Sequence, residues 1–128
     1  MDFPLEYFQI GYNSGPAHAA KIGLQLVSDA GYEWIYWGDD NDPPFRSDCF
    51  ERILSKRKIA KNIGVFGAVG QYFDDSKGIV NRVKTTELEK SAILNVDFVA
   101  GGMSMLINSR VVKQNIFPDS ELFFGFEE

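Results

Sequence analysis

The apolar positions in the first third of the chain predict a β-α-β unit. Bulky β-forming side chains dominate residues 6–10 and 32–37, which predicts two short strands. Between them, apolar side chains recur every three or four residues over 17–30, which predicts a helix that Pro16 opens and Gly31 ends. The buried face of this helix would carry Ala17, Ala20, Leu24 and Val27, and the exposed face His18, Lys21, Gln25 and Ser28. Such a crossover is right-handed, so we expect the two strands to be parallel.

The remaining pattern alternates between further helices and strands. Ser47 is suited to cap a helix over residues 48–60, and Ser109 a helix that reaches about residue 115. Extended segments are expected at 63–69 with a continuation at 71–73, at 79–83 and at 96–100. The polar turn at 74–78 predicts a hairpin, residues 85–91 are helical at best, and residues 103–107 fit either a strand or the start of a helix.

An acidic turn follows the most apolar of these strands. Trp37 and Gly38 are followed by residues 39–42, three acids and an asparagine, and then by Pro43 and Pro44. The prolines cannot continue the strand, so the acids belong to the turn at its carboxyl end. Ligands of open α/β sheets bind at that edge, and carboxylates there are suited to Mg²⁺ or Mn²⁺ and, through the metal, to a phosphate. A solvated loop of ordinary turn residues is the alternative interpretation.

Composition narrows the class of protein. The chain has 128 residues, of which 45% are hydrophobic, and this predicts one folded domain. Its net charge of -5 argues against a nucleic-acid partner. One cysteine excludes an internal disulfide, and one cysteine with one histidine makes a thiol zinc site implausible. Without an apolar run of membrane-spanning length, we expect a cytoplasmic location, either free or at the inner face of a membrane.

Four stretches together resemble the inverting GT-A glycosyltransferases of family 2. Residues 13–15, with Ala20, Lys21 and Gly23, resemble the family's N-x-G segment. Residues 39–42 resemble its D-x-D motif, residues 96–107 the strand and glycine turn beside the acceptor site, and residues 122–128 the approach to its acidic E-D motif. The four occur in the family's order and cover most of the chain.

The resemblance implies a fold and a reaction. The expected fold is α/β, a partial GT-A (Rossmann-like) domain over residues 1–128 with a mixed, mainly parallel sheet flanked by helices. The expected reaction is metal-assisted transfer of a sugar from a nucleotide diphosphate sugar to a glycan or other hydroxyl acceptor, with inversion, as in polysaccharide biosynthesis. The cofactor would be Mn²⁺ or Mg²⁺.

The resemblance also assigns roles to residues. Asp40 and Asp42 would hold the metal, although Gly38 stands where relatives carry the first acid, so the pair Asp39 with Asn41 stays open. Glu128 would be the catalytic base, with Glu127 as its neighbour. The residues expected to contact the substrates are Asn13, Gly15, Lys21, Asp39, Gly101 and Gly102.

The departures from the family define a second hypothesis. The family's nucleoside-recognising β-α-β segment, upstream of the N-x-G element, and its elements after the E-D motif have no counterpart here. We therefore expect these 128 residues alone to be inactive as a transferase. The alternative function is that of a non-catalytic GT-A remnant, a sugar-phosphate-binding or interaction module. For each site residue a plain role competes: a frayed terminus for the two glutamates, a simple turn for the two glycines and a solvated side chain for Lys21.

Overall fold

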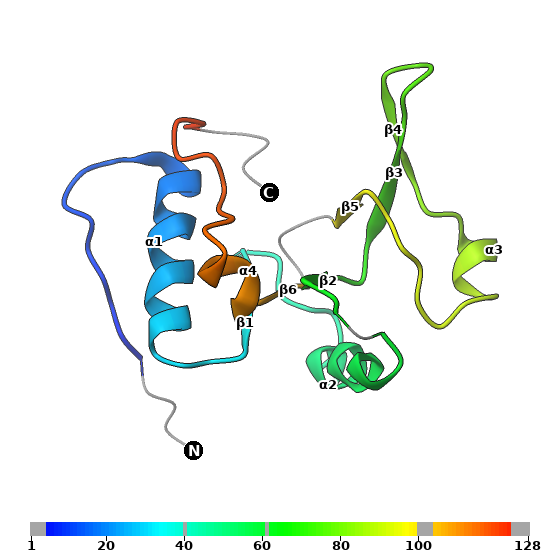
Figure 1. Cartoon of the computed structure of the whole chain (residues 1–128), viewed down its shortest axis with the longest axis horizontal. Helices are drawn as coiled ribbons and strands as arrows, with labels where there is room; N and C mark the ends of the chain where they lie inside the picture. The colour runs from blue at the N-terminus through cyan, green and yellow to red at the C-terminus, as the bar shows by residue number, and fades with distance from the viewer. Residues whose placement is uncertain (1–4, 40, 61, 100–103, 124–128) are drawn as a thin grey trace.

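A computed structural model describes residues 5–39, 41–60, 62–99 and 104–123 (Figure 1). In chain order the elements are α1 (Gly15–Asp29), β1 (Trp34–Trp37), α2 (Cys49–Ser55), the 3₁₀ turn η1 (Lys56–Lys58), β2 (Val65–Phe66), β3 (Gly70–Asp74), β4 (Ile79–Arg82), α3 (Thr85–Leu88), β5 (Phe98–Val99), β6 (Met105–Asn108) and α4 (Ser109–Lys113). The strands form two small sheets, so the expected mixture of helices and strands is confirmed.

The first sheet has the strand order β1-β6-β2, and both of its strand pairs are antiparallel. Ile107 of β6 lies between Ile35 of β1 and Val65 of β2. Since both outer strands run opposite to β6, β1 and β2 point in the same direction. Their carboxyl ends therefore meet at one edge of the sheet, beside the amino end of β6.

One face of this sheet forms the core with α1 and α4. The buried cluster consists of Leu24, Ile35, Met105, Ile107 and Val112, with Val27, Trp37 and Val65 packed against it. The predicted apolar face of α1 is confirmed at Ala17 and Leu24, which are buried. Ser28, expected on the exposed face, is also buried, because α1 is covered over more of its circumference than the apolar stripe indicated.

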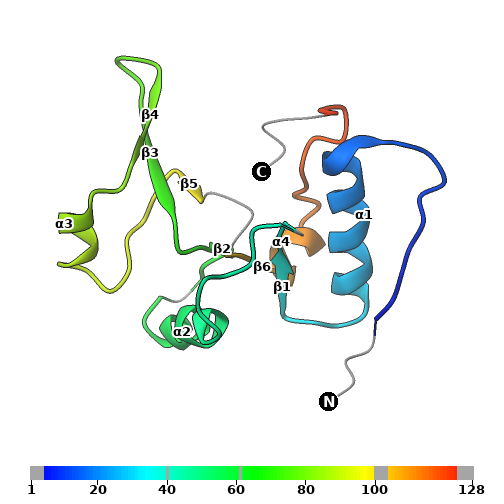
Figure 2. The same ribbon diagram turned by 180° about the vertical axis from the view of Figure 1, so that it is seen from behind.

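The opposite face of the first sheet packs against α2 through aromatic side chains. The ring centroids of Tyr36 in β1 and Phe50 in α2 are 4.7 Å apart. Within the sheet, those of Trp34 in β1 and Phe66 in β2 are 5.3 Å apart. Both separations lie in the range of favourable aromatic contacts. The first sheet therefore has α1 and α4 on one face and one aromatic contact with α2 on the other, and Figure 2 shows α1 and α2 on opposite sides of it.

The second sheet has the order β4-β3-β5, and its β3–β4 hairpin projects from the rest of the molecule (Figure 1). The predicted hairpin is confirmed, with Phe73 of β3 opposite Val80 of β4. Asp74 holds its turn: its Oδ1 accepts a hydrogen bond from the Ser76 backbone N–H at 3.1 Å, and its Oδ2 lies 3.2 Å from the Lys77 ammonium. Gly78 completes the turn at φ 65°, a conformation that favours glycine.

The predicted parallel pairing of the first two strands is wrong. Residues 6–10 form no strand, and the apolar side chains of this segment face solvent, with Leu5 94% and Phe8 60% exposed. The hydrogen-bonding partner of β1 is instead β6, whose four residues are all buried. A fully buried strand gains more from pairing than an exposed one, which favours β6 over residues 6–10 as the neighbour of β1. In the described residues every strand pair is antiparallel, and no mainly parallel sheet forms.

Local boundaries differ from the predictions at both later helices. Asp48, not Ser47, precedes α2, which gives way to η1 at Lys56. Asn108, not Ser109, caps α4, because its Oδ1 accepts a hydrogen bond from the Arg110 backbone N–H at 3.0 Å. The segment left open at 103–107 contributes a strand, β6. Among the described residues, no helix combines the length and the hydropathy that crossing a bilayer requires.

Candidate functional site

The acidic turn lies at the carboxyl end of β1, as the sequence predicts. Asp39, Asn41 and Asp42 are all exposed, so their oxygen atoms face solvent and are accessible to a ligand. The edge they occupy is the one where β2 also ends and β6 begins. There the Ser104 hydroxyl, 1% exposed, accepts a hydrogen bond from the Ala68 backbone N–H at 3.0 Å. This hydrogen bond links the segment after β2 to the residue before β6, a role of Ser104 that no sequence pattern indicated.

Tyr36 lies beside the acidic turn, although the sequence pattern placed it only within the strand expected over residues 32–37. Its ring folds back over Gly38, because a Cβ atom on Gly38 would lie 2.0 Å from Tyr36 Cζ and 2.1 Å from its hydroxyl oxygen. The absent side chain at Gly38 therefore gives the phenol its place at the start of the acidic turn. In the sequence, the only sign of this arrangement is the glycine between the aromatic strand and the acids, and its meaning becomes clear only from the folded structure.

The electrostatics of the turn converge on this phenol. Burial raises the pKa of the Tyr36 hydroxyl above its usual value, and the nearby Asp39 and Asp42 carboxylates, with a smaller contribution from Cys49, raise the pKa further. Both described carboxylates thus act on one hydroxyl group.

We expect Tyr36 to ionise later than an ordinary tyrosine. An alkaline titration followed by tyrosinate absorbance should lose its highest-pH component in Tyr36→Phe, and this component should shift to lower pH in Asp39→Asn with Asp42→Asn. Because the folded-state pKa is raised, the associated stability is present below the unfolded pKa of about 10 and disappears as pH rises through the folded value. Asp75→Asn, an exposed carboxylate at the hairpin tip, controls for net charge. An unchanged highest-pH component in Tyr36→Phe would contradict this assignment.

The donor atoms of the turn fit a hard divalent cation. Two carboxylates and an amide oxygen are the ligand types of Mg²⁺ and Mn²⁺, and Mg²⁺ is often held by one or two carboxylates with phosphate and water completing its shell. Within residues 5–39, 41–60, 62–99 and 104–123, no three His, Cys, Asp or Glu side chains gather to form a complete metal-binding group. Asp40, predicted as a ligand with Asp42, lies outside the described residues.

The residues predicted from the N-x-G segment lie at the amino end of α1. Asn13 Oδ1 accepts a hydrogen bond from the Gly15 backbone N–H at 3.3 Å, so Asn13 supports the helix start. The Lys21 ammonium lies 5.6 Å from the ring centroid of Phe117, within the range of a cation–π contact. Gly15 faces the backbone carbonyl of Phe123. The segment after α4 thus covers this end of α1 and contacts two of the three predicted residues, Gly15 and Lys21.

We expect Gly15→Ala to destabilise the protein by about 1–3 kcal/mol. Gly15 has φ 78°, and an added Cβ would lie 2.3 Å from the Phe123 carbonyl oxygen, a backbone atom that cannot rotate away. Gly23→Ala is the matched control, because nothing lies within 4 Å of its Cβ position inside the same helix. That change should stabilise the protein by about 0.5–1 kcal/mol. Urea unfolding curves measure both, and equal effects of the two substitutions would disprove the contact.

The other predicted site residues lie outside the described residues. These are the metal ligand Asp40, the acceptor-side Gly101 and Gly102, and the catalytic pair Glu127 and Glu128. Their roles remain predictions from the resemblance. Of the predicted set, the structure describes Asn13, Gly15, Lys21, Asp39 and Asp42, and it places them in two groups: one at the start of α1 and one at the end of β1.

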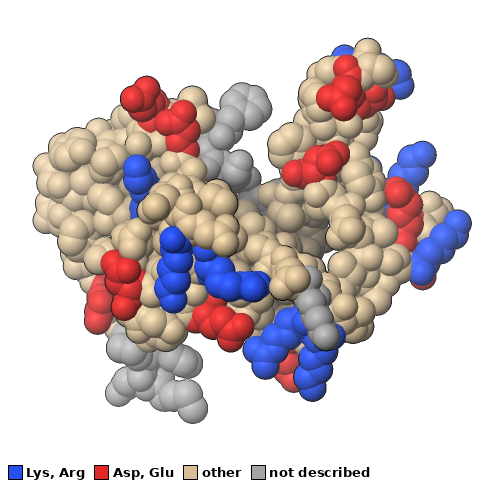
Figure 3. Space-filling view, viewed as in Figure 1, with Lys and Arg blue, Asp and Glu red and all other residues tan. Residues whose placement is uncertain are grey.

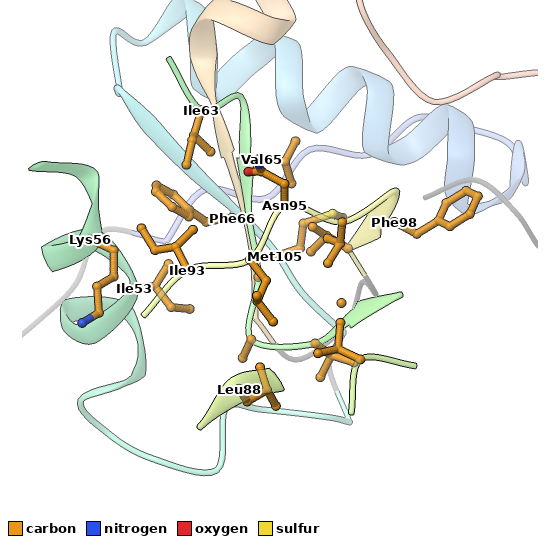
Figure 4. Close-up of a pocket in the computed structure, with 18 of the residues that line it drawn as sticks. Ile53, Lys56, Ile63, Val65, Phe66, Leu88, Ile93, Asn95, Phe98 and Met105 are labelled. Carbon is orange, nitrogen blue, oxygen red and sulfur yellow. The ribbon is translucent and has the colours of Figure 1, made fainter. Parts of the chain in front are cut away.

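A large cavity lies elsewhere in the molecule (Figure 4). It has a volume of about 770 Å³ and is lined by α2, the end of β2, β5 and the segment between α3 and β5. Neither Asp39 nor Asp42 lines it, so it is distinct from the acidic turn.

Comparison of the chain with protein-family models, with curated protein sequences and with solved structures finds no match in any of the three.

Proposed function

We propose that this chain is a GT-A-like glycosyltransferase domain that binds a nucleotide diphosphate sugar through a divalent cation at the acidic turn. The observation that carries the proposal is the exposure of Asp39 and Asp42 at the carboxyl end of β1, with both charges acting on Tyr36. A negative, solvent-facing turn at a strand end is suited to a cation and its phosphate ligands.

In this proposal the metal, the donor and the acceptor are contacted by different residues. Asp40 and Asp42, with Asp39 close in sequence, would hold Mn²⁺ or Mg²⁺, which when bound neutralises charge on a leaving diphosphate. The Tyr36 hydroxyl stays protonated at neutral pH, because its pKa is raised from an already high value, and can therefore donate a hydrogen bond. In this proposal Glu128, with Glu127 beside it, removes the proton from the acceptor hydroxyl, and Gly101 and Gly102 admit the acceptor to the backbone.

The layered arrangement supports a GT-A-like interpretation in part. β1 and β2 share one direction on either side of β6, α1 and α4 cover one face of that sheet, and α2 contacts the other through Phe50. Their common carboxyl edge carries the acidic turn. The finer assignment, a partial GT-A domain, belongs to this proposal, without the mainly parallel sheet that the described strand pairs contradict.

One observation favours the second candidate function, a sugar-phosphate-binding module without catalysis. The amino end of α1 is engaged by the segment after α4, through the Gly15 contact with Phe123 and the Lys21 contact with Phe117. Groups expected to contact the donor are therefore used in packing within the chain. The acidic turn would then bind a phosphate–cation pair with no partner groups for transfer.

A binding and turnover experiment separates the two functions. The protein is titrated with UDP-glucose and GDP-mannose, with and without Mn²⁺, by calorimetry, and released nucleoside diphosphate is then measured. Mn²⁺-dependent binding that is lost in Asp42→Ala supports the cation site that both functions share. Release of nucleoside diphosphate would establish the transferase, whereas binding without release is the result expected of these 128 residues alone under either function. Absence of Mn²⁺-dependent binding to either nucleotide sugar would reject both.

A further inference from the structure

The cavity beside α2 is mainly apolar and open to solvent. Ile53, Phe66 and Ile93 converge on it from α2, β2 and the segment before β5 (Figure 4). Leu88 also lines it and remains 54% exposed, so its open side presents hydrocarbon to water. A volume of about 770 Å³ falls within the range of about 300–1,000 Å³ that is usual for small-molecule sites.

Two cationic side chains, Arg52 and Lys56, line the α2 side of the same cavity. They belong to a basic stretch with Arg57 and Lys58, and Lys and Arg side chains gather over α2 in Figure 3. This local excess is notable in a chain whose net charge is -5. A positive end on an apolar cavity is complementary to a molecule with an anionic head and a hydrocarbon tail.

The acids nearby leave these two cations available. Asp48 accepts two hydrogen bonds from Arg46, at 2.7 and 2.9 Å, whereas its contact with Arg52 is 3.8 Å long. Lys56 forms no ion pair with any described acid. Asp97 also lines the cavity, but its Oδ2 accepts a hydrogen bond from the Phe73 backbone N–H at 2.9 Å. Asp97 is therefore already hydrogen-bonded, Lys56 has no ion pair within the described residues, and Arg52 has only the long contact with Asp48.

We propose that this cavity binds an anionic amphiphile, with the hydrocarbon chain in the apolar space and the anionic head at Arg52 and Lys56. The site is separate from the acidic turn and does not depend on the function proposed for it. The occupant is a lipid-type anion rather than a free anion, because exposed apolar lining such as Leu88 is stabilised by a hydrocarbon partner and not by an inorganic anion.

Alkyl phosphates test this proposal with the whole chain. Octyl, decyl and dodecyl phosphate, each below the concentration at which it forms micelles, are titrated by calorimetry beside inorganic phosphate. We expect saturable one-to-one binding that tightens by up to about fourfold per added methylene. Inorganic phosphate should bind at least tenfold more weakly than dodecyl phosphate. Equal affinity for all four probes, or no binding of any, would overturn the site.

Matched variants locate the two halves of the site. Arg52→Gln with Lys56→Gln should weaken dodecyl phosphate binding about tenfold or more, because charged hydrogen bonds to the head are lost. Arg57→Gln with Lys58→Gln removes the same charge from exposed positions that do not line the cavity, and should have little effect. Equal losses in the two pairs would indicate general surface attraction and overturn the proposal.

The apolar half is tested by filling the cavity. Ala92 lines it from an exposed, non-helical segment, so Ala92→Trp should occupy the space without unfolding the chain and abolish dodecyl phosphate binding. Ala19→Trp, on the exposed face of α1, is the control and should bind normally. Circular dichroism confirms that both variants fold, and normal binding by a folded Ala92→Trp variant would overturn the proposal.

Discussion

Asp40→Ala combined with Asp42→Ala is expected to abolish Mn²⁺ binding and, with it, Mn²⁺-dependent binding of a nucleotide diphosphate sugar. Each carboxylate ligand is expected to contribute at least a factor of about ten in affinity, or about 1.4 kcal/mol. The exposed positions of Asp39 and Asp42 mean that these side chains have few packing roles, so the fold should tolerate changes in the turn. Calorimetry and Mn²⁺ electron paramagnetic resonance measure the loss directly.

A second pair decides the register of the motif. Asp39→Ala with Asn41→Ala removes the alternative ligand set and should weaken Mn²⁺ binding less than the first pair. Asp75→Ala with Glu121→Ala removes two exposed acids away from the turn and controls for net charge. If the Asp39 and Asn41 pair has the larger effect, the register is the alternative one. Unchanged Mn²⁺ binding in both turn variants would place the cation elsewhere.

Local sequence patterns predicted those parts of the fold that neighbouring residues determine. The helix α1 depends on Pro16, on apolar side chains spaced along one face and on Gly31, whose φ of 90° ends the helix. The hairpin of β3 and β4 depends on the polar turn between them. In each case the stabilising contacts lie within a few positions along the chain, so the sequence carries the signal directly.

The pairing of β1 could not be predicted in the same way. Its partner β6 follows more than sixty residues later, and nothing in the sequence of β1 distinguishes β6 from residues 6–10 as a neighbour. The choice depends on burial: Met105, Leu106 and Ile107 are each about 5% exposed, whereas Tyr7 is 85% exposed. Non-local pairing follows from total apolar area buried, which only the assembled fold determines.

The candidate site was predicted in part for a related reason. A turn of acids after an apolar strand is a local pattern, and Asp39 and Asp42 lie where it indicates, at the exposed end of β1. The position of Tyr36 depends instead on the absent side chain of Gly38 and on Phe50 from α2. Contacts between a strand residue and a later helix produce no periodic sequence pattern, so nothing in the sequence singled out this phenol.

Ile107→Ala is expected to produce the largest loss of stability, about 2–5 kcal/mol. Ile107 is 6% exposed and lies between Ile35 and Val65, so its side chain joins the two outer strands of the first sheet across β6. Truncation leaves a cavity under α1 and α4 that the paired strands cannot close without breaking register. Urea unfolding followed by tryptophan fluorescence measures the change, because Trp34 and Trp37 are in the neighbouring strand.

The matched control is Ile116→Ala, which removes the same atoms from a side chain that is 57% exposed. Its effect should remain within about 0.5 kcal/mol, because most of its surface already contacts water. If β6 holds β1 in place, Ile107→Ala should also weaken Mn²⁺ binding near its unfolding midpoint, yet bind normally at low temperature where it is folded. Similar losses of stability in the two variants would contradict the central position of β6, and with it the argument that this strand positions the acidic turn.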